Sequence, residues 1–171
     1  SVLRDALGQT WRFSYDAAAG ITQVTDPQGQ ASAYAYDAKG QLLSIATPGP
    51  GGSRLVQRFE YNGNGDLVRT TDADGRSVLM AYDAQGNQVL QRDGLGNTVT
   101  RTFNAQNQLL TEAVYAQPDP DGDGAGQPSG ALTTRYVYDD ANGTSLRFVI
   151  SAEGRVTEYR RNAYGEAVAV L

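Results

Sequence analysis

The stretch Ala33–Leu42, AYAYDAKGQL, decides the fold, because close copies of it recur along the chain. It places Tyr34 and Tyr36 at alternate positions, follows them with Asp37, and reaches Gly40 three residues later. Related stretches read FSYDAAAG, FEYNGNGDL, LMAYDAQGNQ and RYVYDDANG. The recurring Tyr-Asp pair raises one question, because a phenol beside a carboxylate can carry chemistry or can simply begin a turn.

The copies recur with a period of 21 residues, which separates Tyr15 from Tyr36 and Tyr61 from Tyr82. Two insertions interrupt this period, near residues 48–55 and 115–133. Self-similarity at this spacing is typical of repeat proteins, whose units pack mainly on their neighbours. The sequence therefore predicts a single block of about seven repeats over residues 1–171, as a fragment of a longer chain.

Each repeat contains two turn motifs that begin with Asp, Asn or Ser and end with Gly or Asn. One kind reads DALG, DPQG, DADG, DGLG and SAEG, and the other reads DAKG, NGNG, DAQG, NAQN and NAYG. The pattern indicates a type I β-turn, in which the first side chain binds a backbone N–H and the fourth residue takes a positive φ. Such turns commonly join the two strands of a hairpin.

The segments between the turns are rich in β-branched and aromatic residues and alternate with period two. Examples are QASAYAY at 30–36, RSVLMAY at 76–82, NTVTRTF at 97–103 and TTRYVY at 133–138. No segment shows the 3.6-residue period of a helix. We therefore predict an all-β fold, a meander of antiparallel β-hairpins in which equivalent aromatic rings form ladders with neighbouring rings in contact.

Composition and charge exclude several classes of function. The chain has a net charge of −5, and its 14 Lys and Arg residues are scattered, which argues against a nucleic-acid partner. It contains no His and no Cys, so the familiar catalytic triads and thiolate metal sites are absent and we predict no enzyme activity. No apolar run approaches the ~20 residues that a membrane-spanning helix needs.

An internal comparison favours a structural role for the Tyr-Asp pairs. Asn62, Asn104 and Asn162 stand where other repeats have Asp. Asn keeps the hydrogen bond of the turn and tolerates its backbone angles, but it cannot act as an acid or a strong cation ligand. The alternative is that the phenols and carboxylates bind sugars by stacking and hydrogen bonding.

The insertion DPDGDGAGQPSG at 119–130 is the candidate metal site. Asp119, Asp121 and Asp123, followed by Gly124, match the opening of a calcium loop, in which alternate carboxylates converge on a hard cation. The twelfth position is Gly130, where an EF-hand needs a bidentate Glu. We therefore expect weak calcium binding, with an acidic, solvated loop as the alternative and no other cofactor.

The repeat resembles the YD repeat of the Rhs family, most closely in YAYDAKGQLLSIATP and VTDPQGQASAYAYDAKG, and the resemblance covers nearly all of the chain. This family includes bacterial polymorphic toxins, the B and C components of insecticidal Tc toxins, wall-associated proteins and teneurins. The resemblance implies a continuous twisted or spiralling sheet that forms a segment of a hollow β-shell. In the bacterial toxins that shell encloses a C-terminal toxic domain.

Two functional hypotheses follow. The first is a non-catalytic shell segment of a secreted or cell-surface bacterial protein, whose partners are the rest of the shell and an encapsulated toxin domain that the shell helps to deliver. The alternative is an extracellular module that binds glycans or cell-surface proteins through exposed tyrosines. The open edge strands of such a segment also predict self-association.

Overall fold

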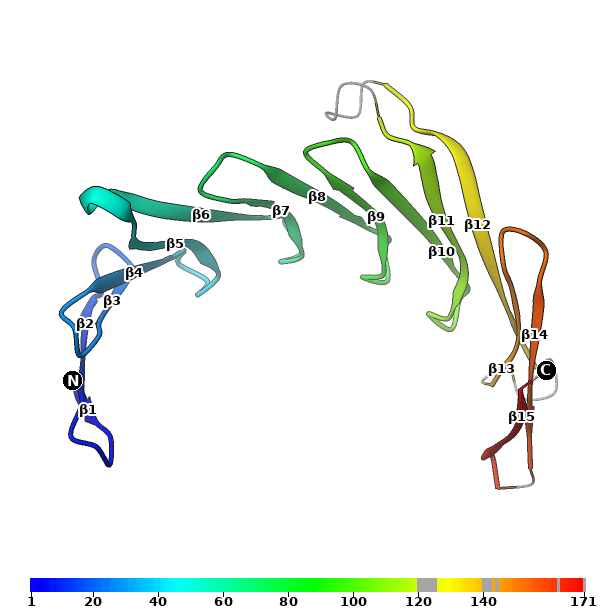
Figure 1. The fold of residues 1–171 in the computed structure, drawn as a ribbon, viewed down its shortest axis with the longest axis horizontal. Coiled ribbons are helices and arrows are strands. Elements are labelled where there is room, and N and C mark those ends of the chain that lie inside the picture. Colours follow the sequence, from blue (N-terminus) through cyan, green and yellow to red (C-terminus); the bar gives the residue numbers. More distant parts are fainter. Residues whose placement is uncertain (120–125, 140–142, 144, 163, 171) are drawn as a thin grey trace. The chain divides into compact units, whose positions relative to one another are not determined.

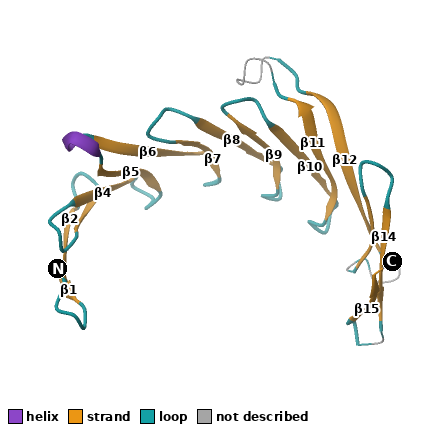
Figure 2. Ribbon diagram, in the orientation of Figure 1, coloured by secondary structure: helices purple, strands orange, loops and turns teal. Residues whose placement is uncertain are grey.

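The structure is a computed structural model of the protein, which describes residues 1–119, 126–139, 143, 145–162 and 164–170. These residues form 15 β-strands and one short 3₁₀ helix, which confirms the all-β prediction (Figures 1 and 2). The chain divides into two compact units, Ser1–Val78 and Leu79–Leu171. In the described part of the chain, no helix is long and apolar enough to cross a membrane.

The first unit is an antiparallel meander in which each strand pairs with the next one in the sequence. Its elements are β1 (Val2–Arg4), β2 (Thr10–Asp16), β3 (Ile21–Thr25), β4 (Ala31–Tyr36), β5 (Leu42–Pro48), η1 (Pro50–Gly52), β6 (Arg54–Tyr61) and β7 (Leu67–Thr71). Strand β8 (Ser77–Tyr82) spans the division between the units.

The second unit repeats this architecture, again with antiparallel pairing of consecutive strands. Its strands are β9 (Gln88–Asp93), β10 (Thr98–Phe103), β11 (Leu109–Gln117), β12 (Ser129–Tyr138), β13 (Leu146–Ile150), β14 (Val156–Arg161) and β15 (Ala167–Val170). Each unit is therefore a chain of β-hairpins, as the repeat predicts.

The turns contain the hydrogen bonds that the sequence predicts. After β4, the N–H of Gly40 donates to the carbonyl oxygen of Asp37 at 3.0 Å. The Asp37 carboxylate accepts the N–H groups of Lys39 and Gln41, each at 2.8 Å. Gly40 has a φ of +82°, and Asn107 takes the same position in the NAQN turn with a φ of +61°. The aspartate of the Tyr-Asp pair is thus the first residue of a turn.

Both insertions lie at the ends of hairpins. The first forms the single turn η1, and the N–H of Gly49 donates across it to the carbonyl oxygen of Ser53 at 2.9 Å. The second begins in the last residues of β11, and part of it is strand: residues 129–132 belong to β12, although the sequence analysis assigned 129 and 130 to a loop. They pair with the end of β11, so the ladder between these two strands is longer than the repeat alone requires.

The predicted ladder of neighbouring aromatic rings is wrong. Thr22 on β3 pairs with both Tyr15 on β2 and Tyr34 on β4, so it separates the two rings. The next residue in this row is Ile45 on β5. Because each repeat supplies two strands, equivalent residues lie two strands apart, at about 9.5 Å. Aromatic side chains therefore alternate with smaller ones along the sheet.

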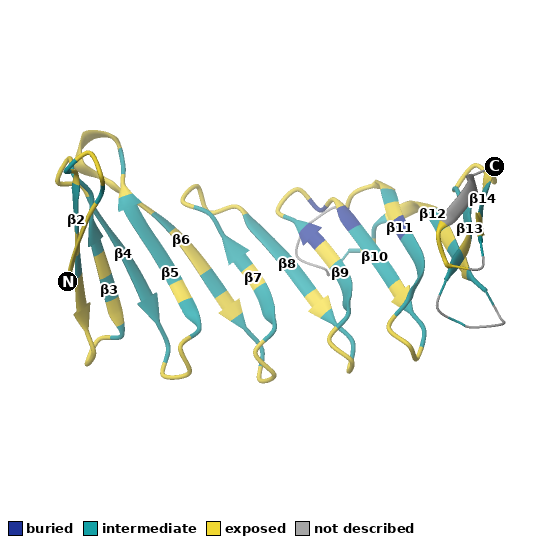
Figure 3. Cartoon of the chain, turned by 90° about the horizontal axis from the view of Figure 1, so that it is seen from below, coloured by how far each residue is buried: buried dark blue, intermediate teal, exposed yellow. Residues whose placement is uncertain are grey.

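In each unit the sheet leaves both faces largely accessible. Few of the described residues are buried (Figure 3). Ala113 is the one buried apolar side chain among them, and the buried polar residues are Arg92, Thr98 and Asp119. The accessible surface of the chain is 11119 Å². A compact monomer of 18.2 kDa exposes roughly 8,100 Å², about 3,000 Å² less. A sheet of this kind needs something else to cover its apolar side chains.

Candidate functional site

The buried polar residues meet where β9 and β10 join. The carboxylate of Asp119, from the second insertion, is fully buried, and its Oδ2 lies 3.2 Å from Nη1 of Arg92. Arg92 Nε–H donates to Oγ1 of Thr98 at 3.2 Å, and this hydroxyl donates to the carbonyl oxygen of Gly96 at 2.8 Å. The N–H of Asp119 donates to the same carbonyl at 2.9 Å. We call these four residues the clamp.

The clamp fixes the start of the second insertion to the DGLG turn of the neighbouring hairpin. Neither carboxylate oxygen of Asp119 accepts a hydrogen bond from a described residue, so the ion pair with Arg92 compensates its charge. A buried charge with a single partner is held strongly, because losing that partner leaves the other charge uncompensated. The clamp therefore holds the insertion against the turn and has a structural role.

The calcium prediction falls partly outside the described residues, since Asp121 and Asp123 lie there. Asp119 is described, and a cation bound to its carboxylate would compete with the guanidinium of Arg92. Across the described ranges, no three His, Cys, Asp or Glu side chains gather to hold a metal ion. Calcium binding by Asp119, Asp121 and Asp123 stays a prediction.

Calorimetric titration of calcium into the protein tests this prediction. If the insertion binds the cation, a dissociation constant of about 10⁻⁴–10⁻³ M is expected, as in other modules with few ligands. Asp121→Asn should abolish the heat of binding, whereas Asp74→Asn, in an exposed turn outside the insertion, should leave it unchanged. Heat that persists in Asp121→Asn would place the cation elsewhere.

The turn aspartates can be tested at Asp37. Asp37→Ala removes the acceptor of two backbone N–H groups, and we expect the free energy of unfolding to fall by about 1–2 kcal/mol. Asp37→Asn keeps an oxygen acceptor and should change it by less than about 0.5 kcal/mol. Urea denaturation measures both. Equal losses in the two variants would mean that the negative charge, rather than the turn, is what the protein needs.

Two turn carboxylates also bind a side-chain amide. Nδ2 of Asn87 donates to both carboxylate oxygens of Asp83, at 3.2 and 3.0 Å. Nδ2 of Asn97 donates to Oδ2 of Asp93 at 2.8 Å. These side-chain hydrogen bonds, together with those from the backbone, lower the pKa of Asp83 and the pKa of Asp93 below the usual 3.8.

This lowering predicts a loss of stability in acid. A carboxyl group whose pKa is lower in the folded state contributes stability above its unfolded pKa, and that contribution is lost as the pH falls through the folded pKa. The free energy of unfolding should therefore decline as the pH falls below 3.8. Denaturation in urea at neutral and acidic pH should show a smaller decline in the double variant Asn87→Ala/Asn97→Ala. An identical decline in that variant would contradict the assignment.

Tyr136 lies near an ion pair on the second unit. Arg101 on β10 donates from Nε to Oε2 of Glu112 on β11 at 2.8 Å, near Tyr136 on β12. Burial raises the pKa of Tyr136, and the negative charge of Glu112 raises it further. The phenol therefore stays neutral at physiological pH. Since Arg101 already compensates Glu112, this arrangement suits packing or binding rather than proton transfer.

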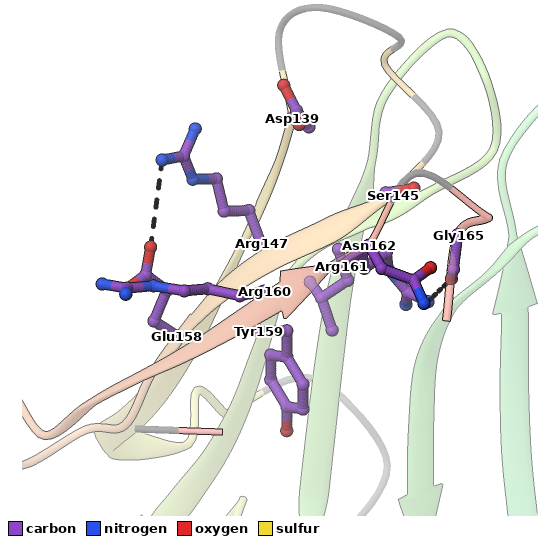
Figure 4. Close-up of a pocket in the computed structure, with 10 residues that line it drawn as sticks. Asp139, Ser145, Arg147, Glu158, Tyr159, Arg160, Arg161, Asn162 and Gly165 are labelled. Carbon is purple, nitrogen blue, oxygen red and sulfur yellow. Dashed lines mark hydrogen bonds and ion pairs between the residues drawn. The ribbon is translucent and has the colours of Figure 1, made fainter. Parts of the chain in front are cut away.

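A depression of ≈ 520 Å³ lies beside the ends of β13 and β14 (Figure 4). Glu158 lies between two arginines: both Nε and Nη2 of Arg160 are 2.9 Å from its Oε2, and Nη2 of Arg147 is 3.8 Å from its Oε1. Nη1 of Arg161 donates to the carbonyl oxygen of Gly165 at 2.8 Å. The charged side chains that line the depression are therefore paired with other groups of the protein, which makes the depression a weak candidate for a substrate site.

Turn-to-turn hydrogen bonds form a feature that the sequence did not predict. Nε2 of Gln41 donates to the carbonyl oxygen of Gly65 in the first unit, at 3.4 Å. In the second unit, Nδ2 of Asn87 donates to Oδ1 of Asn107 at 3.0 Å. The donor in each case follows the last residue of a turn. Amide residues at this position, common in the repeat, are the signal that could have indicated the contact.

Comparison with known proteins supports the fold. Residues 18–53 and 61–98 match the family model described as RHS Repeat. No curated protein matches the sequence. The crystal structure of TcdB2-TccC3-Cdc42 is similar with a TM-score of 0.50 and 17% identity, over 94% of this chain and 10% of that chain. The Tc holotoxin pore of Photorhabdus luminescens has a TM-score of 0.49 and 16% identity, with the same coverage.

Proposed function

We propose that this chain of the RHS repeat family forms part of the wall of a β-shell that encloses and helps to deliver a C-terminal toxin domain. Its role in that shell is structural rather than catalytic. The observation that carries the proposal is the fold, which is built from repeated antiparallel hairpins in a chain whose accessible surface is 11119 Å². It spans a tenth of the length of the TcdB2-TccC3-Cdc42 chain that it resembles, so the role of a whole shell is inferred.

A wall explains both the repeat and the exposed surface. A sheet that packs on nothing leaves its apolar side chains in contact with water, and stable domains bury that surface against a second layer or by closing the sheet. Strand β1 pairs with β2, and its opposite edge contacts no described strand, so a further hairpin can be added there. Further repeats would extend the sheet, and a sheet that closes around an enclosed domain would have one of its faces covered by that domain.

The partners and location follow from this role. We infer that the chain contacts the remaining repeats of its own shell through strand edges and contacts an enclosed toxin domain through one face. The protein is then bacterial and is secreted or displayed at the cell surface.

Limited proteolysis of the full-length natural protein tests the enclosure. The domain that follows the repeats should survive a protease concentration that digests the same domain expressed alone, because the wall excludes the protease. Mass spectrometry identifies the surviving fragment. Digestion of that domain at the same rate in both samples would overturn the proposal.

The alternative is a binding module for glycans or cell-surface proteins, which the exposed rings of Tyr15 and Tyr164 favour, at 68% and 90% accessibility. A glycan array probed with this chain tests it. Binding that disappears in Tyr15→Ala, while Ser14→Ala binds normally, would favour this function over the shell. Most other strand tyrosines are half-buried, which fits the shell better.

A further inference from the structure

The charged strand residues of the first unit all lie on one face of the sheet. Directly paired residues of antiparallel strands share a face, so the row Asp16, Ile21, Ala35, Ser44 and Arg58 defines it. Alternation and pairing place every other charged strand residue of β1 to β7 on the same side. We call this the charged face; its charged residues are Arg4, Arg12, Asp16, Arg54, Arg58, Glu60 and Arg69.

The opposite face of this unit carries no charged strand residue. Its central row is Tyr15, Thr22, Tyr34, Ile45 and Gln57. By alternation along β2, β4 and β6, further aromatic residues lie on the same side, and we call it the aromatic face. Those residues are Trp11, Phe13, Tyr36, Phe59 and Tyr61.

The two faces differ in how favourably they are hydrated. Arg12 and Arg58 on the charged face are exposed and form no ion pair with a described residue, as expected for hydrated side chains. Tyr15 on the aromatic face is 68% accessible and the other rings are half-buried, although no other element of the first unit lies over them. Contiguous apolar surface that remains exposed marks a place where another molecule binds. The aromatic face is therefore the face to be covered.

The charge of this face indicates what covers it. A face without charges offers no ion-pair partner, so its occupant must bury uncharged surface. Tyrosines provide rings for packing and hydroxyls for adaptable hydrogen bonds. The face thus fits a polypeptide of low charge rather than an acidic or basic one.

We propose that the aromatic face of residues 1–71 points into the shell and contacts the enclosed domain, while the charged face is turned to solvent. This inference rests on the proposed function. It assigns each strand residue of the first unit to one side of the wall, and it predicts that the occupant presents uncharged polypeptide surface to Tyr15, Tyr34 and their neighbours on that face.

Single cysteines test the assignment, because the chain contains none. Thr22 and Gln23 are adjacent on β3 and lie on opposite faces, in the rows that contain Tyr34 and Ala33, respectively. Thr22→Cys and Gln23→Cys are made in the full-length protein, with any cysteine elsewhere replaced. Each is reacted with a bulky polyethylene-glycol maleimide and, separately, with a benzophenone maleimide for photocrosslinking. Mass spectrometry identifies the crosslinked partner.

We expect the maleimide to react with the cysteine at 22 at least about tenfold more slowly than with the cysteine at 23, because it reaches an inward-facing residue only when the shell opens locally. We also expect the cysteine at 22 to crosslink to the enclosed domain. Slower labelling at 23, with a crosslink from 23 to the enclosed domain, would overturn the proposed orientation of the faces but would still support the shell. Rapid labelling of both, without a crosslink to that domain, would overturn the shell and the inference together. A crosslink from 22 to a second copy would replace the enclosed domain with a face-to-face dimer.

Discussion

Asp119→Ala is expected to lower the free energy of unfolding by about 3 kcal/mol, because it leaves the guanidinium of Arg92 without a counter-charge. The Arg92 side chain is only 10% exposed in the folded protein. It must then stay buried and unpaired, or the second insertion must lift off the DGLG turn and admit water. Admitting water hydrates the arginine and so limits the loss of stability. We therefore expect a value at the lower end of the range of unfolding free energies lost when buried ion pairs are broken. Urea denaturation at neutral pH measures it.

An exposed ion pair is the matched control. Arg69 and Glu60 lie 3.8 Å apart, with side chains 44% and 60% exposed, so Arg69→Ala should cost no more than about 1 kcal/mol. The double variant Arg92→Met/Asp119→Leu removes both charges and should recover most of the stability that Asp119→Ala loses. Equal effects of Asp119→Ala and Arg69→Ala would show that the ion pair does not hold the insertion.

The turns and strands were predictable because their signals are local. Asp37 and Gly40 lie within one turn, and each acts there through hydrogen bonds and backbone angles that do not depend on distant residues. The two faces of the first unit were also visible in the sequence, since Arg58 and Glu60 alternate with Phe59 and Tyr61. That alternation gains meaning only when the pairing of strands shows that charged residues share one face.

The arrangement of the aromatic rings and the clamp were not predicted from these local signals. The two turn motifs of each repeat predict two strands, but the ladder prediction did not take account of the second strand, whose Thr22 separates Tyr15 from Tyr34. The contact between Arg92 and Asp119 joins a repeat to an insertion that interrupts the period. The acidic run around Asp119 suggested a metal ligand, whereas the structure pairs this residue with a guanidinium. No local pattern distinguishes those two roles for a carboxylate.

Gly96→Ala is expected to lower the free energy of unfolding by about 4 kcal/mol, through two costs that add. Gly96 has a φ of +82°, and an alanine in this left-handed region costs about 1–2 kcal/mol. The added Cβ would also overlap the backbone carbonyl oxygen of Asp119. Because that atom belongs to the backbone, it cannot move aside as the end of a flexible side chain can. The clamp must therefore open.

Gly86 separates the two costs, because its φ of +84° is nearly the same and no atom lies within 4 Å of an added Cβ. Gly86→Ala should lose only the backbone term, about 1–2 kcal/mol in urea denaturation. Once the clamp is open, removing Asp119 should cost little more. Gly96→Ala/Asp119→Ala should thus lose much less than the sum of the single variants, with a coupling of about 2 kcal/mol. Additive losses would mean that Gly96 is needed for its backbone conformation alone, and that the insertion is held by other contacts.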